Sequence, residues 1–350
     1  MKEEKYDIKS RNPAELTEFV TGLGEKSFRA KQIFDWLHAK QVSDFEEMKN
    51  LPKNLIQTLS RTCSPLSLKQ ETVQISEQDG TRKYLFMLPD GNRIESVLMR
   101  YRHGNAVCIS SQAGCRMGCR FCASTQEGLA RGLTPSEMLD QVYQIGKETG
   151  ERVSSVVVMG IGEPLDNFDS LVRFTELLTH EDGLHLSQRN LTVSTCGLVP
   201  EIRRLAEYRF SLTLAVSLHA PVQEKRRQLI PVADRYPLPE LMEACQYYFE
   251  QTGRRVTFEY SLIAGFNDTE ADADALAGLL RGFRGGMRCH VNLIPVNPVR
   301  GRAFRQPHRA VVAAFKNKLE KNGINVTIRR EMGRDIDGAC GQLRRRYAQA

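Results

Sequence analysis

Three cysteines lie within eight residues of the chain in the spacing C-x3-C-x2-C, at Cys115, Cys119 and Cys122. A structural zinc site normally takes four Cys or His ligands, usually as two separated pairs. Three closely spaced thiolates can instead bind three irons of a [4Fe–4S] cube and leave the fourth iron open to a non-protein ligand. An open metal position suits catalysis better than scaffolding. The spacing therefore favours an iron–sulfur site, and zinc is the alternative.

Two further cysteines could do chemistry, because a thiolate is a competent nucleophile. Cys108 lies seven residues before the triplet, and Cys340 lies near the end of the chain in the polar sequence DIDGACGQL. A lone cysteine is more often an incidental thiol, so spacing alone assigns neither a role. The remaining cysteines match no motif and are interpreted as packing thiols; they are Cys63, Cys196, Cys245 and Cys289.

A glycine-rich turn follows an apolar, β-branched run at 153–159 that is typical of a buried parallel strand. The turn reads Gly160-Ile-Gly-Glu-Pro164. Glycines directly after a strand allow the backbone to approach a ligand closely. The pattern indicates a ligand-binding loop, although glycine–proline turns are also common without a ligand.

Positive charge is concentrated at the end of the chain. Residues 300–350 contain thirteen Lys and Arg against four Asp and Glu. This segment alone therefore has a net charge of +9, compared with +7 for the whole chain. A basic end on a nearly neutral body suggests a polyanionic partner, most simply nucleic acid. A solvated, solubilising face is the alternative.

The elements that must position these residues follow an alternating order. Residues 1 to about 60 are predicted to form short helices, and the runs 83–88 and 93–101 flank the turn sequence PDGN as a β-hairpin. Strand-like and helical runs then alternate, which predicts a parallel sheet with right-handed crossovers. Six or so such units favour a partial or full barrel with its function at the carboxyl ends of the strands, and an open doubly wound sheet is the alternative. The strands are expected at 106–110, 153–159, 190–195, 212–218, 255–262, 288–294 and 324–329, and the helices from 134 and at 167–179, 200–208, 237–252, 270–283 and 307–322.

The triplet, with Phe121 directly before its last cysteine, resembles the radical S-adenosylmethionine (SAM) superfamily, and the turn at 160–164 resembles that superfamily's glycine-rich motif. The resemblance implies a [4Fe–4S] cluster on Cys115, Cys119 and Cys122, whose open iron binds SAM. It further implies that the reduced cluster splits SAM into methionine and a 5′-deoxyadenosyl radical.

A longer resemblance, from about residue 25 to 347, is to the RlmN/Cfr family of radical SAM RNA adenine methyltransferases. It is carried by Cys108, the triplet, and the segments RAKQIFDWLH, MGIGEPLDN, SLHAP, NLIPVNP and DIDGACGQL. Pro164 favours the RlmN branch, which methylates C2 of adenine; the Cfr branch methylates C8 and usually has alanine there. The implied substrates are adenosine 2503 of 23S rRNA and adenosine 37 of some transfer RNAs. Cfr-type C8 methylation, which gives antibiotic resistance, is the alternative.

The family's scheme assigns roles to three residues. Because C2 of adenine has no nucleophilic lone pair, one SAM first methylates Cys340, and the radical from a second SAM activates that methyl group for addition to C2. Glu95 then accepts the C2 proton. Cys108 attacks the sulfur of Cys340, which forms a transient disulfide and releases the methylated RNA. By the same resemblance the SAM contacts are Gly162, Glu163, Pro164, Ser194, Ser217, Leu218, His219 and Asn297.

Without the resemblance, Glu95 would be taken for an ordinary exposed strand glutamate and His219 for a satisfied core histidine. Two rival classes stay open: a different radical SAM enzyme, such as one that activates a glycyl radical enzyme, and a zinc-stabilised RNA-binding protein. Neither rival needs Cys108 and Cys340 together.

The expected organisation is an α/β chain with a partial (βα)6-type radical SAM barrel. A helical accessory domain that holds the RNA fold is expected at 1–60, a connecting segment with the hairpin at 61–101, the barrel at 102–336 and the Cys340-bearing segment at 337–350. The expected cofactors are one [4Fe–4S] cluster per chain and two SAM molecules per turnover. The expected partners are 23S rRNA, transfer RNA and a reducing electron donor such as flavodoxin. A cytoplasmic monomer without a membrane segment is expected, because the N-terminus lacks a signal peptide and no apolar run approaches about 20 residues.

Overall fold

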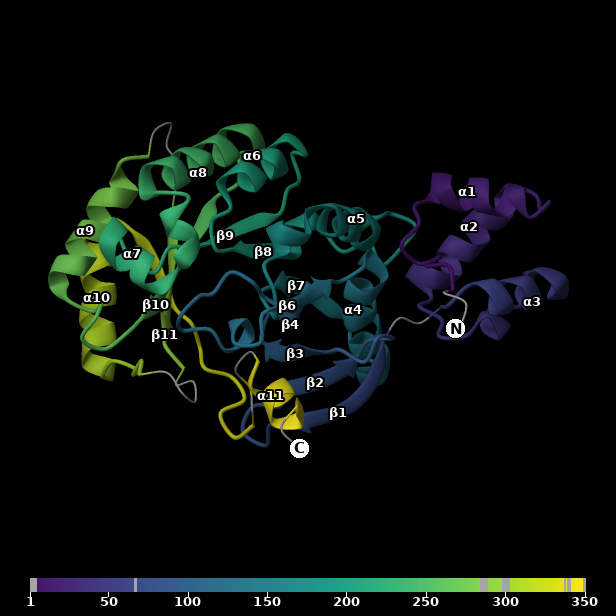
Figure 1. Cartoon of the computed structure of the whole chain (residues 1–350), viewed down its shortest axis with the longest axis horizontal. Helices are drawn as coiled ribbons and strands as arrows, with labels where there is room; N and C mark the ends of the chain where they lie inside the picture. Colours follow the sequence, from purple (N-terminus) through teal and green to yellow (C-terminus); the bar gives the residue numbers. More distant parts are fainter. Residues whose placement is uncertain are drawn as a thin grey trace.

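The structure is a computed structural model that describes residues 5–65, 68–283, 289–297, 303–336, 338 and 341–348. Figure 1 shows a large lobe built around a sheet and a small helical lobe beside it that contains the N-terminal part of the chain. Cys340 lies outside the described residues, as do 337 and 339. Among the helices that the structure describes, none is long and apolar enough to cross a membrane.

The small lobe is helical, as the sequence predicts. Its first helix begins at a capping box in which Asn12 and Glu15 satisfy each other's backbone N–H groups, with Pro13 in the first turn. Its helices are α1 (Pro13–Gly22), α2 (Phe28–Phe34), a π-helical continuation (Asp35–Ala39), a 3-10 turn (Phe45–Glu47) and α3 (Lys53–Thr62).

One ten-stranded sheet runs through the large lobe, and its strands neighbour one another in the order of the chain except that β5 and β6 form a separate pair. The first three strands are antiparallel, and the sheet is parallel from β4 onward. The strands are β1 (Lys69–Ile75), β2 (Arg82–Met87), β3 (Arg93–Tyr101), β4 (Gly104–Ile109), β5 (Gln112–Gly114), β6 (Leu129–Gly132), β7 (Val153–Val158), β8 (Leu191–Thr195), β9 (Thr213–Ser217), β10 (Val256–Leu262), β11 (His290–Pro295) and β12 (Asn325–Ile328).

Helices connect the parallel strands, and the sequential strand order means that every crossover advances in the same direction. In a doubly wound sheet the order would reverse at a switch point, so the predicted barrel is confirmed and the open-sheet alternative is wrong. The helices of this lobe are α4 (Pro135–Thr149), α5 (Phe168–Thr179), α6 (Val199–Glu207), α7 (Gln223–Leu229), α8 (Leu238–Thr252), α9 (Glu270–Arg281), α10 (Arg309–Lys321) and α11 (Gln342–Ala348), with short 3-10 turns η3 (Ala123–Thr125), η4 (Pro164–Asn167), η5 (Gln188–Asn190) and η6 (Pro231–Asp234).

The predicted strands from 106 onward are all present, with ends that differ by at most two residues. β10 is buried at every position, because it lies in the middle of the parallel part of the sheet and is covered on both faces. α4 begins where its start is predicted, at a capping box formed by Thr134 and Glu137. The sequence did not predict β1, the β5–β6 pair or the short helices α7 and α11.

The predicted hairpin is the β2–β3 pair, and it does not stand apart from the barrel. β3 pairs with β4 along most of its length, so the antiparallel strands extend the barrel sheet. Figure 1 shows α11, at the end of the chain, lying against these strands. The hairpin strands therefore connect the first barrel strand with the C-terminal segment.

Candidate active site

A cavity of about 640 Å³ opens at the carboxyl ends of the barrel strands. It gathers residues that lie far apart in the sequence, as expected for a barrel active site. The predicted site residues that line it are Glu95, Cys108, Cys115, Cys119, Cys122, Gly162, Glu163, Pro164, Ser194, Ser217, His219 and Asn297. Leu218 does not line the cavity and is fully buried beside it. Cys340 lies outside the described residues, but Gly338 also lines the cavity.

The three cysteines lie in the loop between β5 and η3, and backbone contacts fix that loop. Cys115 N donates to Gly128 O at 2.8 Å, and Arg120 N donates to Leu229 O at 2.9 Å. The Phe121 ring packs edge-on against His219 with 4.7 Å between ring centroids. None of the three thiols forms a disulfide. The loop thus presents three unoxidised sulfurs to one cavity.

The chemistry of these thiols fits the positively charged iron–sulfur core of a cluster. Burial raises the pKa of Cys115 to about 12 and the pKa of Cys119 well above its ordinary value. Neutral thiols are therefore favoured until a cation stabilises the thiolates, as metal binding does. Among the described residues, no three His, Cys, Asp or Glu side chains converge as one metal ion would require. A cube places its three ligands on three separate irons, so this donor set fits a [4Fe–4S] cluster better than a tetrahedral zinc ion.

The glycine-rich turn packs so tightly that side chains would not fit. A Cβ at Gly160 would lie 2.6 Å from Ile109 O, and one at Gly162 would lie 2.6 Å from Gln112 Cβ. Gly162 also has a φ of 113°, which L side chains rarely adopt. These two glycines therefore allow the turn after β7 to press against the end of β4 and border the cavity.

A single glutamine ties the glycine-rich turn to the cysteine loop. Gln112 accepts a hydrogen bond from Glu163 N at 2.9 Å and donates one to Asp166 at 2.9 Å. Asp166 also binds the Arg116 guanidinium within the cysteine loop. The two motifs found in the sequence are thus parts of one hydrogen-bonded network.

Glu163 is buried, and its carboxylate holds backbone groups at the edge of the cavity. It accepts hydrogen bonds from Leu165 N at 3.1 Å and from Cys196 N at 2.7 Å. Burial raises the pKa of Glu163, and these bonds to the carboxylate oppose that rise. The side chain fixes the loop after β8. The predicted contact between Glu163 and SAM would therefore use atoms of Glu163 that do not take part in these two hydrogen bonds.

His219 is hydrogen-bonded to neighbouring backbone and side-chain groups in the core, and it also lines the cavity. Its Nδ1 accepts a hydrogen bond from Ser261 N at 2.9 Å, and its carbonyl accepts one from Asn267 Nδ2 at 2.7 Å. Burial lowers the pKa of His219 to about 3, so the imidazole is neutral. The residue has a φ of 57°, a left-handed conformation held by these two bonds.

Glu95 is not the exposed strand glutamate that sequence reasoning alone would suggest: only 2% of it is exposed. Lys83 Nζ lies 2.6 Å from its Oε2, and the Lys83 side chain is as deeply buried. Two groups from the C-terminal segment reach the same carboxylate, because Gly341 N and Arg344 N each donate to it at 2.6 Å. Glu95 therefore joins the hairpin strands to the residues that directly follow Cys340.

The register of the hairpin puts Cys108 on the same face. Val97 pairs with Lys83 on one side and with Cys108 on the other, and Glu95 lies two residues before Val97. Alternate residues of a strand share a face, so Lys83, Glu95 and Cys108 all face the cavity. Burial raises the pKa of Cys108, and the charges of Arg329 and Lys83 oppose that rise.

Several cavity residues were missed by the sequence analysis. Lys83 and Glu259 are buried charged residues in strands, a signal that could have found them. Cys196, interpreted as a packing thiol, does pack with Cys119 but also lines the cavity. Basic side chains surround the cavity from the C-terminal third of the chain; they are Arg309, Arg329, Arg330 and Arg334. Arg329 directly follows β12, and residues that directly follow a barrel strand are candidates for the active site.

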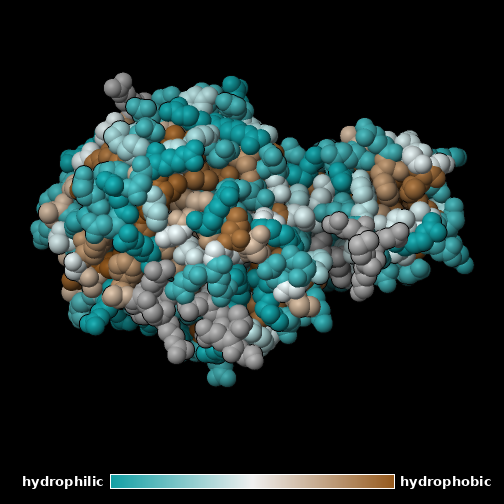
Figure 2. Space-filling view, in the orientation of Figure 1, coloured by the Kyte–Doolittle hydropathy of each residue, from teal (hydrophilic) through white to brown (hydrophobic). Residues whose placement is uncertain are grey.

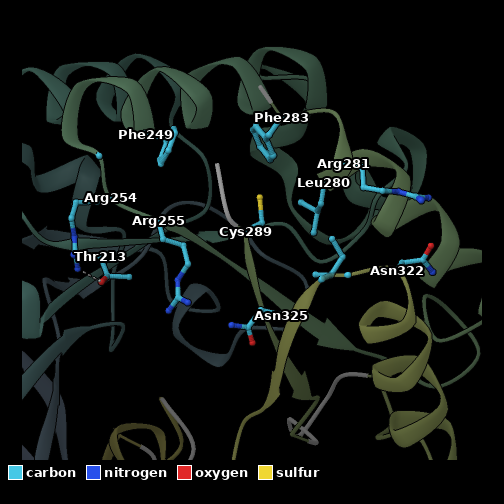
Figure 3. Close-up of a pocket in the computed structure, with 13 residues that line it drawn as sticks. Thr213, Phe249, Arg254, Arg255, Leu280, Arg281, Phe283, Cys289, Asn322 and Asn325 are labelled. Atoms are coloured by element: carbon cyan, nitrogen blue, oxygen red, sulfur yellow. Dashed lines mark hydrogen bonds between the residues drawn. The ribbon is translucent and has the colours of Figure 1, made fainter. Parts of the chain in front are cut away.

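Figure 2 shows hydrophobic residues gathered in a hollow of the large lobe between hydrophilic rims. A second cavity of about 910 Å³ lies at the opposite, amino ends of the strands and is larger. Figure 3 shows its wall, with Thr213 at the start of β9, Arg254 and Arg255 before β10, and Asn325 at the start of β12. It contains none of the predicted site residues. The cavity at the carboxyl ends is therefore the candidate active site.

Comparisons with known proteins identify the relatives of this chain. Residues 6–64 match a family model described as the ribosomal RNA large subunit methyltransferase N-terminal domain, and residues 109–277 match the radical SAM superfamily. A protein of Lachnospira eligens named "Probable dual-specificity RNA methyltransferase RlmN" is 59% identical over 97% of this chain and 96% of its own length. A protein of the same name from Clostridium perfringens is 51% identical over 95% of both chains. The crystal structure of a radical SAM methyltransferase from Sphaerobacter thermophilus superposes with a TM-score of 0.91, at 42% identity over 96% of this chain and 98% of that one.

Proposed function

Because the chain belongs to the RlmN family within the radical SAM superfamily, we propose that it is an RNA methyltransferase that adds a methyl group to C2 of adenine. Superfamily membership brings a [4Fe–4S] cluster and SAM as cofactors. The proposed substrates are adenosine 2503 of 23S rRNA and adenosine 37 of some transfer RNAs. The names and lengths of the relatives, which this chain matches almost end to end, support RNA methylation.

One observation carries the proposal: the buried carboxylate of Glu95 lies in one cavity with Cys108 and the cysteine triplet. It also binds the backbone of Gly341, the residue after Cys340. A proton acceptor, a free thiol and the methyl-carrier segment are the groups that carbon methylation through a cysteine requires. A radical SAM enzyme of another class would not need this combination.

The cofactors, when bound, supply the methyl group and the radical that activates it. The chain's own residues then have three tasks in the proposed reaction. Cys340 carries the methyl group on its sulfur. Glu95 accepts the proton that leaves C2 after the new carbon–carbon bond forms. Cys108, as a thiolate, attacks the Cys340 sulfur, so that a disulfide forms and the bond between that sulfur and the RNA-linked carbon breaks. That carbon keeps the electron pair of the broken bond and takes up a proton, which completes the new methyl group.

Lys83 supports two of these tasks. Its ammonium pairs with the Glu95 carboxylate at 2.6 Å and holds it in the cavity. The same charge favours the thiolate of Cys108 against the effect of burial. Lys83 is thus a positioning residue for both the proposed base and the proposed resolving thiol.

The choice of C2 over the C8 of Cfr-type enzymes is supported by Pro164, which lines the cavity at the start of η4. The arginines around the cavity support a polyanionic substrate, because phosphate contacts could position a base that has left its stack. The helical lobe supports recognition of RNA by shape.

The test is reconstitution of the protein without oxygen, with SAM, a low-potential reductant, and separate 23S rRNA and transfer RNA substrates. Mass spectrometry of the digested nucleosides should find 2-methyladenosine. Finding 8-methyladenosine would move the chain to the Cfr-type alternative. Methyl groups only on nitrogen or oxygen atoms would contradict the proposal, because such atoms can attack SAM directly.

A further inference from the structure

Arg226 is a buried cation without a carboxylate partner. It lies in α7, and none of its surface is exposed. Its Nη2 donates to Cys196 O at 2.8 Å and lies 3.4 Å from Ser217 O, while its Nε and Nη1 are buried without a hydrogen-bond partner. A buried charge is normally paired, because removing an ion from water costs several kcal/mol.

The two buried lysines in the described part of the chain are each paired with a carboxylate. Lys9 Nζ lies 2.5 Å from Asp140, and Lys83 Nζ lies 2.6 Å from Glu95. No Asp or Glu lies within ion-pair distance of Arg226 among the described residues. The groups that favour the charged form of its guanidinium are the sulfurs of Cys196, Cys119 and Cys245 in their thiolate form.

The position of α7 explains this neighbourhood. Leu229 and Ile230, at the end of α7, pack in one cluster with Cys119 and Cys196. Leu229 O accepts the hydrogen bond from Arg120 in the cysteine loop, and Ile230 N donates to Arg226 O at 2.9 Å. Arg226 does not line the cavity. It therefore lies behind the wall that carries the cysteines and does not reach a ligand directly.

We propose that Arg226 is the buried counter-charge of the cysteine-bound [4Fe–4S] cluster and raises its reduction potential. Three thiolates make the cluster site anionic, and reduction adds one more electron, so a fixed positive charge behind the cysteines stabilises the reduced state more than the oxidised one. Low dielectric around a buried charge strengthens this effect. The cluster in turn stabilises a guanidinium that the protein's own carboxylates leave unpaired.

The inference depends on the cofactor of the superfamily and not on which RNA atom is methylated. Its test is the midpoint potential of the reconstituted cluster, measured without RNA by redox titration followed by electron paramagnetic resonance. A failure of the RNA proposal would leave this measurement unaffected. The informative variants are Arg226→Met, which removes the charge, and Arg226→Lys, which keeps it.

Arg227→Met is the matched control. Arg227 is the next residue of α7, its side chain is 55% exposed, and it pairs with Asp234. Removing its charge should leave the potential unchanged, because an exposed charge is screened by solvent. The control therefore separates a buried charge from any charge on the same helix.

In Arg226→Met, the ratio of reduced to oxidised cluster at a fixed potential should fall about tenfold, which is about 59 mV for a one-electron couple. That is the change expected of a unit charge acting over roughly 10 Å at an effective dielectric constant of about 20. Arg226→Lys should stay within about threefold of wild type in the same ratio. An unchanged potential in the methionine variant, or an equal fall in the lysine variant, would overturn the proposal.

A second measurement covers loss of cluster binding. Arg226→Met could fold and yet take up no cluster. In that case, cluster binding by Arg226→Lys would support a requirement for the positive charge. Loss of cluster binding in both variants would contradict that requirement. In the cluster-free protein, thermal unfolding should be no earlier for Arg226→Met than for wild type, because the unpaired charge is gone. Marked destabilisation of the cluster-free methionine variant would show that Arg226 acts through packing instead.

Discussion

At the scale of single residues, the ion pair of Lys83 and Glu95 decides whether the proposed base is available. Both side chains are buried, so each depends on the other for its charge. Removing one partner of such a pair leaves an uncompensated buried charge, which the protein avoids by changing its protonation. Without Lys83, the buried carboxylate of Glu95 would lose its cationic partner.

We expect Lys83→Met to slow product formation by roughly 10²–10⁴-fold, the usual contribution of general base catalysis. Lys83→Arg should restore most of the rate, because it returns the charge. Single-turnover kinetics across a pH range provide the measurement, since a purely structural role would not change the pH profile. Lys69→Met, at an exposed position of β1, is the control. A Lys83→Met rate within about twofold of wild type would contradict this role.

How much of the site the sequence predicts also depends on single residues. The cysteine triplet and the glycine-rich turn are local patterns that can be found in the sequence, whereas the predicted SAM contacts and the roles of Cys108 and Cys340 came from the family resemblance. Lys83 could not be found in this way, because its importance comes from its strand register: it pairs with Val97, which also pairs with Cys108. The burial of Glu95 depends on a segment 246 residues later in the chain.

At the scale of elements, the antiparallel strands serve as a support for the C-terminal segment. The turn between β1 and β2 binds Asp335, whose carboxylate accepts hydrogen bonds from Ser76 Oγ at 2.6 Å and Glu77 N at 2.8 Å. In the same turn, Asp79 accepts a bond from Gly333 N at 3.0 Å. On the far side of Cys340, Arg344 pairs with Glu127. The segment is thus held on both sides of Cys340, the proposed methyl carrier.

Asp335→Ala should loosen this support. We expect faster amide hydrogen exchange at Gly341 and Arg344, whose N–H groups bind Glu95, and a fall in turnover of about tenfold or more because small misplacements are costly in catalysis. The cluster content should not change. Asp274→Ala, which removes an exposed carboxylate near Lys318, serves as the control. Unchanged exchange at residues 341–344 would show that the turn does not hold the segment.

The elements themselves were largely predictable. The parallel strand β7 is a valine-rich run, and capping residues mark the starts of α1 and α4. Short elements were missed because a helix as short as α7 carries too few turns for a periodic pattern. β1 was missed because most of its side chains are exposed or half-buried and polar.

At the scale of the whole molecule, the small lobe is joined to the barrel through polar contacts with α4. Lys9 forms its buried ion pair with Asp140, His38 Nδ1 lies 3.1 Å from Tyr143 Oη, and Asp7 accepts a bond from Ser136 Oγ at 2.9 Å. Figure 2 shows hydrophobic residues exposed on the far end of this lobe over α1 and α2, where Phe28 is 52% exposed. The junction fixes that surface relative to the cavity, which suits recognition of a large RNA.

The junction should make stability depend on pH through His38. Burial lowers the pKa of His38 to about 3, from an ordinary value of about 6.5. Between these values the unfolded chain binds a proton that the folded chain does not, so stability falls as pH falls. From about pH 6 to about pH 4.5, wild type should lose about 2 kcal/mol more than His38→Gln, at about 1.4 kcal/mol per pH unit. Urea unfolding at each pH measures this difference.

The glutamine variant keeps a polar group near Tyr143 but cannot titrate. His103→Gln, at an exposed position, is the control and should follow wild type. An equal pH slope for His38→Gln and wild type would mean that His38 is protonated in the folded protein, contrary to its burial.

The most direct test of the proposed function separates the role of Cys108 as resolving thiol from that of Cys340 as methyl carrier. Cys108→Ala, reconstituted with cluster and given SAM, reductant and RNA, should complete the chemistry up to release and accumulate a covalent protein–RNA adduct on a denaturing gel. The Cys108→Ala, Cys340→Ala double variant should form no adduct, and Cys63→Ala should turn over normally. If Cys108→Ala turns over normally and leaves no adduct, Cys108 is not the resolving thiol and the proposed use of this cavity is wrong.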